Sequence, residues 1–140
     1  MSEEMKNYIG TKEIKARPMT LGEYNKYRGW DIPSDEDPEK EVYLVEYAVD
    51  PDSKPNHADH EGYITMSPKH LFDKEYKPSD TFLDRLLIER DELSSKISKL
   101  DAALEGKKVP ADSITILEIQ VSQMSHYLGT LEERIEMSNK

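Results

Sequence analysis

The sequence predicts an α+β protein in which a small mixed N-terminal module is followed by an antiparallel helical hairpin. Two observations support this fold class. Residues 8–77 hold seven of the eight tyrosines and the only tryptophan, in short runs with Val and Ile that favour strands. Residues 79–140 instead carry two long apolar patterns with helical spacing. We therefore expect one domain at residues 1–78 and a second at residues 79–140.

The first module is expected to alternate short strands and short helices. Three segments rich in Tyr, Val and Ile are expected to be strands, namely residues 8–16, 41–49 and 61–66. The segment between the last two, residues 50–60, is a polar loop dense in Pro, Asn and Asp. Residues 21–30 predict a helix that runs into Gly29, and residues 67–76 predict another, with Ser67 as N-cap and Pro68 as first helical residue.

The second module predicts two helices of matching length. The first, capped by Ser79 or Asp80 and ending near Gly106, carries one apolar stripe made of Leu86, Leu93, Ile97, Leu100 and Leu104. The second, capped by Asp112 or Ser113, carries apolar residues at alternating spacings of three and four, namely Ile114, Leu117, Val121, Met124, Leu128, Leu131 and Ile135. Each arm is roughly 33 to 36 Å long, so the two can pack antiparallel along their whole length.

The apolar face of this hairpin is wider than a single seam needs. Leu87, Ile88, Ile116 and Ile119 flank the two stripes. A lone two-helix hairpin cannot shield both helices from water. Further helices from other copies of the chain are the most economical cover, so we expect a homo-oligomer.

Composition and charge exclude several classes of function. The net charge of −10, with no cluster of Lys and Arg, opposes binding to DNA or RNA. The chain has no Cys, which excludes disulfides and thiolate chemistry. It has neither a signal-peptide pattern at its start nor an apolar run of membrane-spanning length. We expect a protein of the cytoplasm without a membrane partner.

The sequence gives no support for an enzyme. None of the common nucleophile, phosphate-loop or zinc-protease motifs is present. His57, Asp59 and His60 could supply metal ligands, but this spacing is common in loops and no second cluster completes a site. We expect no cofactor and no metal.

Aromatic and basic residues gather in the segment 24–30. Tyr24, Tyr27, Arg28 and Trp30 could stack a nucleobase or form a protein-binding hot spot. They could equally fill the core of a module that is short of leucine, which is the interpretation we favour.

Three cations of the hairpin adjoin its apolar stripes. Lys96 and Lys99 lie between core residues, and Arg134 precedes Ile135. Such positions can direct a cation along a subunit interface, where it serves either an interhelical salt bridge or an anionic ligand.

The hairpin resembles a known family, the small helical phage proteins that act as anti-CBASS sponges for cyclic oligonucleotide second messengers. The resemblance is carried by FLDRLLIERDELSSKISKLDAAL and QVSQMSHYLGTLEERI and covers about 60 of the 140 residues. It implies a symmetric oligomer, in the family a hexamer, that holds cyclic dinucleotides between subunits. Some members also hold cyclic trinucleotides at a separate site. The first module resembles one that recurs in phage proteins of unknown role, through YIGTK, YNKYRGW, GYI and SPK.

The resemblance also implies roles for single residues. Lys96 matches a lysine that contacts dinucleotide phosphates, with Lys99 close by. Ser98 and Arg134 match residues of the trinucleotide site, and Thr81 or Phe82 stands where the family has a base-stacking aromatic. The implied function is a phage anti-defence protein that sequesters these messengers in the host cytoplasm without cleaving them. The alternative is an interaction adaptor that recognises a protein through its aromatic module.

Overall fold

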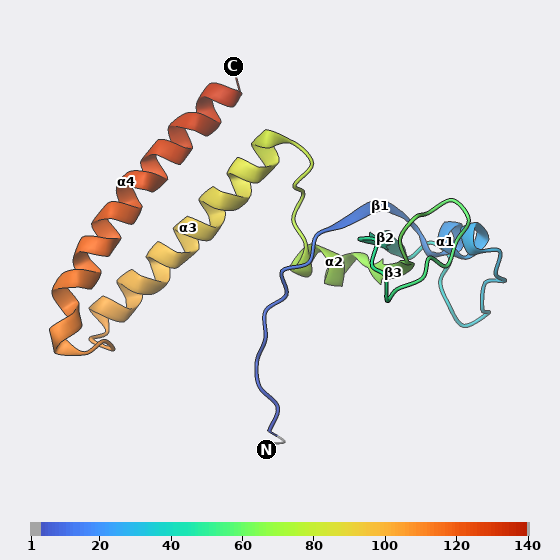
Figure 1. Ribbon diagram of the computed structural model, residues 1–140, viewed down its shortest axis with the longest axis horizontal. Helices are drawn as coiled ribbons and strands as arrows, with labels where there is room; N and C mark the ends of the chain where they lie inside the picture. The colour runs from blue at the N-terminus through green and yellow to red at the C-terminus, as the bar shows by residue number, and fades with distance from the viewer. Residues whose placement is uncertain (1–3, 140) are drawn as a thin grey trace. The chain divides into compact units, whose positions relative to one another are not determined.

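The chain divides into two compact units, the first ending at Tyr76 and the second beginning at Lys77. The computed structural model describes residues 4–139 (Figure 1). The α+β fold class predicted from the sequence is confirmed, because the first unit contains an antiparallel sheet with helices and the second is helical.

The first unit is built on a three-stranded antiparallel sheet in the order β1-β2-β3. The strands are β1 (Ile14–Thr20), β2 (Glu41–Tyr47) and β3 (Ile64–Pro68). The predicted first strand, residues 8–16, was placed too early in the chain. Ile14 already pairs with Tyr47, the last residue of β2, so the residues before Ile14 have no partner on that strand.

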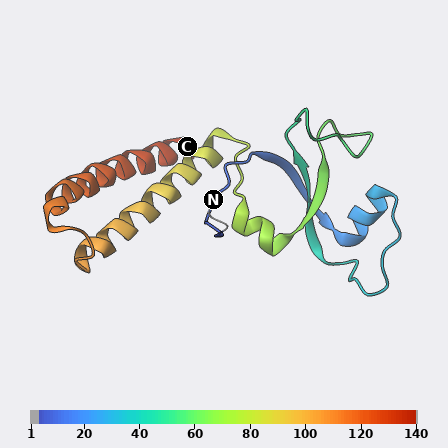
Figure 2. The ribbon, with the colours of Figure 1, turned by 60° about the horizontal axis from the view of Figure 1, so that its bottom comes forward.

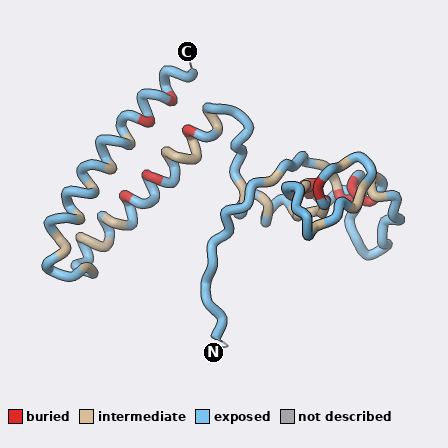
Figure 3. The backbone as a smooth tube through the Cα atoms, in the orientation of Figure 1, coloured by how far each residue is buried: buried red, intermediate tan, exposed pale blue. Residues whose placement is uncertain are grey.

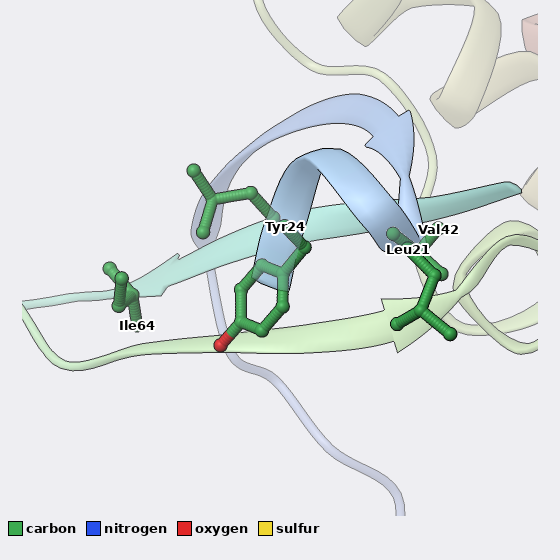
Figure 4. Packing of buried hydrophobic residues seen from close by; sticks show 5 residues of the cluster. Leu21, Tyr24, Val42 and Ile64 are labelled. Carbon is green, nitrogen blue, oxygen red and sulfur yellow. The ribbon is translucent and has the colours of Figure 1, made fainter. Parts of the chain in front are cut away.

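Helices α1 (Leu21–Arg28) and α2 (Lys69–Glu75) lie on opposite faces of this sheet (Figure 2). Alternation along β2 places Val42 and Leu44 on the face that α1 covers and Tyr43 on the other. The Tyr43 ring stacks on Phe72 of α2, with 3.9 Å between ring centroids. Figure 4 shows the core under α1, which consists of Leu21, Tyr24, Val42, Leu44 and Ile64.

The ends of these two helices test the predicted caps. Helix α1 ends at Gly29, as predicted, because a left-handed φ of 74° there favours glycine. The predicted Ser67 cap of α2 is wrong. Ser67 lies within β3, and Pro68 takes the N-cap position without a side-chain hydrogen bond.

The second unit is a hairpin of α3 (Phe82–Glu105) and α4 (Ile114–Ser138), joined by a loop that includes the short 3-10 helix η1 (Ala111–Ser113). With 24 and 25 residues, the helices are about 36 and 38 Å long and run antiparallel side by side (Figures 1 and 2). No helix among residues 4–139 combines the length and apolar content that crossing a membrane requires.

The N-cap of α3 differs from the prediction, and the predicted N-cap of α4 is in place but lacks the expected side-chain hydrogen bond. The N-cap of α3 is Thr81, not Ser79 or Asp80, because Thr81 and Asp84 form a reciprocal capping box. Ser113 precedes α4 as predicted but makes no side-chain capping bond. Gly106 follows α3 with a right-handed φ of −79°, and Lys107 makes the left-handed turn at 52°.

Burial along the hairpin is uneven. The buried positions cluster in the first two thirds of α3 and the last turns of α4 (Figure 3), namely Leu86, Leu93, Ile97, Leu131 and Ile135. Towards the loop, the residues of both stripes are only half-buried. Ile116 and Ile119, predicted to widen the apolar face, are 61% and 48% exposed. The single chain therefore leaves part of its predicted apolar face uncovered.

Candidate ligand-binding site

Three of the predicted ligand-binding residues, Phe82, Lys96 and Arg134, lie along one flank of the hairpin, and two of them, Phe82 and Arg134, are in contact. Phe82, Glu89 and Lys96 recur every seven residues along α3, on the side of its seam that faces Tyr127 and Arg134 of α4. The Arg134 guanidinium lies 5.7 Å from the centroid of the Phe82 ring, and the Tyr127 hydroxyl donates a hydrogen bond to Glu89. We refer to these five residues as the Lys96 flank.

The charges on this flank suit an anionic ligand. The hydrogen bond from Tyr127 occupies Glu89, and it raises the pKa of Tyr127 above its ordinary value, with partial desolvation adding to the effect. Neither Lys96 nor Arg134 forms an ion pair with a carboxylate of residues 4–139. The interhelical salt bridge considered for these cations is therefore not formed within the described chain, and both can bind a ligand.

The opposite flank of the hairpin has the opposite charge. The heptad positions that border the core there hold Asp101, Glu118 and Glu132, all of them exposed. Carboxylates repel phosphate at close range. The Lys96 flank carries two cations and one carboxylate, Glu89, so it is the flank less unfavourable to an anion.

Thr81 and Phe82 have different surroundings. The Thr81 hydroxyl accepts a hydrogen bond from the Asp84 backbone N–H at 2.9 Å, which fixes it as the helix cap. The Phe82 side chain is 58% exposed, and its ring lies beside the Arg134 guanidinium. Of the two residues, only Phe82 offers a ring on which a base could stack.

The single chain does not bring together the residues predicted for a dinucleotide site or those predicted for a trinucleotide site. Lys96 follows Phe82 by 14 residues, which is about 21 Å along α3. Ser98 and Lys99 follow the buried Ile97 on the exposed side of the helix, and Ser98 lies about 24 Å from the turn where Phe82 meets Arg134.

A hollow at the start of α3 is a poor anion site. It has a volume of about 220 Å³ and is lined by Lys77, Pro78, Asp84, Leu87, Ile88 and Asp91. Two carboxylates against one ammonium group make its lining unfavourable for phosphate.

The aromatic segment of the first unit is divided between core and surface. Tyr24 is buried in the core, as the favoured interpretation expects. Trp30 is 52% exposed, and the Arg28 guanidinium lies 4.2 Å from its ring centroid. The segment thus contributes to the core and also leaves one large ring at the surface.

The histidines considered as metal ligands are held by other contacts. His60 Nδ1 lies 2.5 Å from Glu46 Oε1, and His60 Nε2 lies 2.6 Å from the Tyr27 hydroxyl. Both ring nitrogens are therefore occupied, and residues 4–139 contain no group of three potential metal ligands. Sequence reasoning missed Glu46, although a charged residue on the inward face of a strand, after Val42 and Leu44, is the signal that could have found it.

The region of the chain that matches a known family coincides with the hairpin. The Sequestin family model matches residues 80–137, a segment that spans α3, η1 and most of α4. This segment is similar to the Sequestin family. The resemblance inferred from its sequence motifs is thereby confirmed for the helical half. The Sequestin segment contains all six predicted ligand-binding residues, and the first unit lies outside it. Neither the curated proteins nor the solved structures yield a match to this chain.

Proposed function

We propose that this chain is a phage anti-defence protein that binds cyclic oligonucleotide second messengers and sequesters them in the host cytoplasm without cleaving them. The observation that carries the proposal is the coincidence of the Sequestin match with the helices that form the Lys96 flank. The family description, Sequestin, suggests sequestration, which requires that a ligand be bound and retained but not that it react.

The chemistry of the Lys96 flank suits a cyclic oligonucleotide. Lys96 and Arg134 can donate charge-assisted hydrogen bonds to phosphate oxygens. The exposed ring of Phe82 can stack a base, an interaction worth about 1 to 3 kcal/mol. Sequestration needs these contacts alone and no activated water.

The spacing of the site residues indicates that binding requires more than one copy of the chain. Lys96 and Phe82 lie too far apart in one protomer to contact the same small messenger, and so do Ser98 and Arg134. A second hairpin packed on the half-buried part of the seam could complete both sites. A homo-oligomer, a hexamer in the family that the hairpin resembles, would repeat each donor around the ligand.

A thermal-shift panel of cyclic dinucleotides and trinucleotides tests the proposal. A ligand at a hundredfold excess over Kd stabilises the folded state by about 2.7 kcal/mol, which moves the melting temperature by several degrees. Lys96→Ala should abolish the shift for dinucleotides and Arg134→Ala the shift for trinucleotides. The matched control is Lys108→Ala, in the exposed loop of the same unit. Equal shifts in all three variants would refute the site assignment.

A protein-interaction adaptor is the second candidate, and the half-exposed Trp30 favours it. In this case the helices only assemble the chain, and the aromatic segment recognises a protein. Trp30→Ala would then remove the partner from a pull-down, and no cyclic nucleotide would raise the melting temperature. A nucleotide shift that survives in Trp30→Ala would favour sequestration.

A further inference from the structure

The face of the sheet that α1 covers changes from apolar to charged along β2. Val42 and Leu44 lie in the apolar core, and Glu46 continues the same face beyond it. Cross-strand pairing sets Arg17 beside Leu44 and Lys15 beside Glu46, so both cations lie on this face. A hollow of about 270 Å³ opens here, and it is lined by Lys15, Ala16, Arg17, Tyr27, Leu44, Glu46, Asp59 and His60.

A hydrogen-bonded chain forms one wall of the hollow. Glu46 binds His60 Nδ1 at 2.5 Å, and His60 Nε2 binds the Tyr27 hydroxyl at 2.6 Å. The second carboxylate oxygen of Glu46 accepts the Gly62 backbone N–H at 3.2 Å. These contacts hold the pKa of Glu46 below its ordinary value, chiefly through the bond to His60. Both oxygens of Glu46 are thus occupied.

The Tyr27 ring is held between two further groups. The His57 ring stacks on it at 4.5 Å with an interplanar angle of 8°, and the Arg17 guanidinium lies 5.3 Å from its centroid. Tyr27 therefore supports Arg17 at the edge of the hollow while His60 fixes the phenol from the other end.

The two cations on the β1 side remain available. Lys15 and Arg17 are exposed, and neither is within ion-pairing distance of a carboxylate among the described residues. One alternative role for charged side chains on an edge strand is to prevent that strand from pairing with another sheet. That role needs no hollow beside the charges, no apolar floor and no ring that supports the guanidinium. The hollow is lined by two carboxylates, Glu46 and Asp59. Among the described residues, no side chain donates a hydrogen bond to the Asp59 carboxylate.

We propose that this hollow binds a phosphate group carried on a small apolar or aromatic body, with Lys15 and Arg17 contacting the phosphate and Leu44 and Tyr27 contacting the body. Lys15 and Arg17 supply two positive charges, and a guanidinium matches the oxygen geometry of a phosphate. Glu46 and Asp59 add two negative charges to the lining; Glu46 is bonded to His60 and Gly62, so Asp59 is the carboxylate that opposes an anion. The site lies in the first unit and is independent of the nucleotide sites proposed for the hairpin.

The probe for this site is phenyl phosphate, titrated into the full chain and followed by backbone amide chemical shifts. We expect saturable shifts centred on residues 15–17, 27 and 57–60. Arg17→Gln and Lys15→Gln should each weaken binding roughly tenfold, as expected for the loss of one charge-assisted hydrogen bond. Lys54→Gln is the matched control in an exposed position of the same unit and should change nothing.

Two further sets of variants distinguish this site from a loss of folding and from the hairpin. Asp59→Asn removes a repelling charge and should tighten binding about two- to threefold, an effect opposite in sign to that of any unfolding. Lys96→Ala and Arg134→Ala should leave phenyl phosphate binding intact, whatever they do to cyclic nucleotides. Equal effects of Arg17→Gln and Lys54→Gln, or phenol binding as tightly as phenyl phosphate, would overturn the assignment.

Discussion

The guanidinium of Arg134 lies 5.7 Å from the centroid of the Phe82 ring, which ties the end of α4 to the first turn of α3. The next contact along this flank, between Tyr127 and Glu89, comes one heptad further into the hairpin. Lys96 occupies the next position in the same row. Phe82 and Arg134 therefore have both a structural contact and a proposed role in ligand binding, so stability and affinity must be measured in parallel for each substitution.

Replacement of Phe82 by alanine should weaken both stability and binding. The exposed cation–π contact with Arg134 is worth about 0.5 to 1 kcal/mol, which sets the expected loss of unfolding free energy. Phe82→Tyr retains a ring and should preserve both properties. Urea denaturation, with the affinity for cyclic dinucleotides measured in parallel, checks this prediction. An unchanged affinity in Phe82→Ala would exclude this ring as the stacking aromatic.

Replacement of Leu131 by alanine should destabilise the hairpin strongly. Leu131 is completely buried in the hairpin core, where loss of a leucine side chain costs about 2 to 5 kcal/mol. The helical signal in far-ultraviolet circular dichroism reports this transition. The fluorescence of Trp30, the only tryptophan, reports the first unit and should change much less. A parallel loss in both signals would mean that the two units unfold together.

Polar substitution of the exposed apolar residues of α4 should reduce assembly. Ile116 and Ile119 are 61% and 48% exposed in the protomer, so Ile116→Ser with Ile119→Ser removes little from its own core. If these residues pack against another copy, native mass spectrometry should show a smaller assembly with intact helical content. Gln123→Ser, at an exposed position of the same helix, is the control. An unchanged mass in the double variant would place the interface elsewhere.

Acid should destabilise the first unit through Glu46. Its bond to His60 lowers the pKa of Glu46 below the ordinary value of 4.5, so its contribution to stability is complete above that value. The contribution is lost as pH falls through the lower, folded-state pKa. Glu46→Gln should lower the unfolding free energy at neutral pH and flatten its decline below about pH 4.5. The exposed Glu39→Gln is the control, and an acid profile of Glu46→Gln identical to that of the unsubstituted protein would contradict the prediction.

The sequence predicted the hairpin well because its packing is local and periodic. Leu93, Ile97, Leu131 and Ile135 were identified by spacing alone, and all are buried. Caps were less predictable. Ser79, Asp80 and Thr81 can all cap a helix, and the choice of Thr81 depends on Asp84 three residues later, which completes the capping box.

The first unit was harder to predict because its contacts are distant in sequence. The register of β1 depends on the end of β2, which residues 8–16 do not reveal. The chain of Glu46, His60 and Tyr27 joins a strand, a loop and a helix, and no spacing rule links those positions. The resemblance of the hairpin motifs identified Lys96 and Arg134, whereas the contacts of Arg134 with Phe82 and of Tyr127 with Glu89 became evident only in the structure.

Recovery of the messenger after binding tests the central claim most directly. The purified protein is incubated with a cyclic dinucleotide or trinucleotide, the free ligand is measured after filtration, and the protein is then heat-denatured to release what it held. Sequestration predicts that free ligand falls in proportion to added protein and that heating returns it intact. Free ligand that does not fall, or that returns as a linear product, would contradict the account.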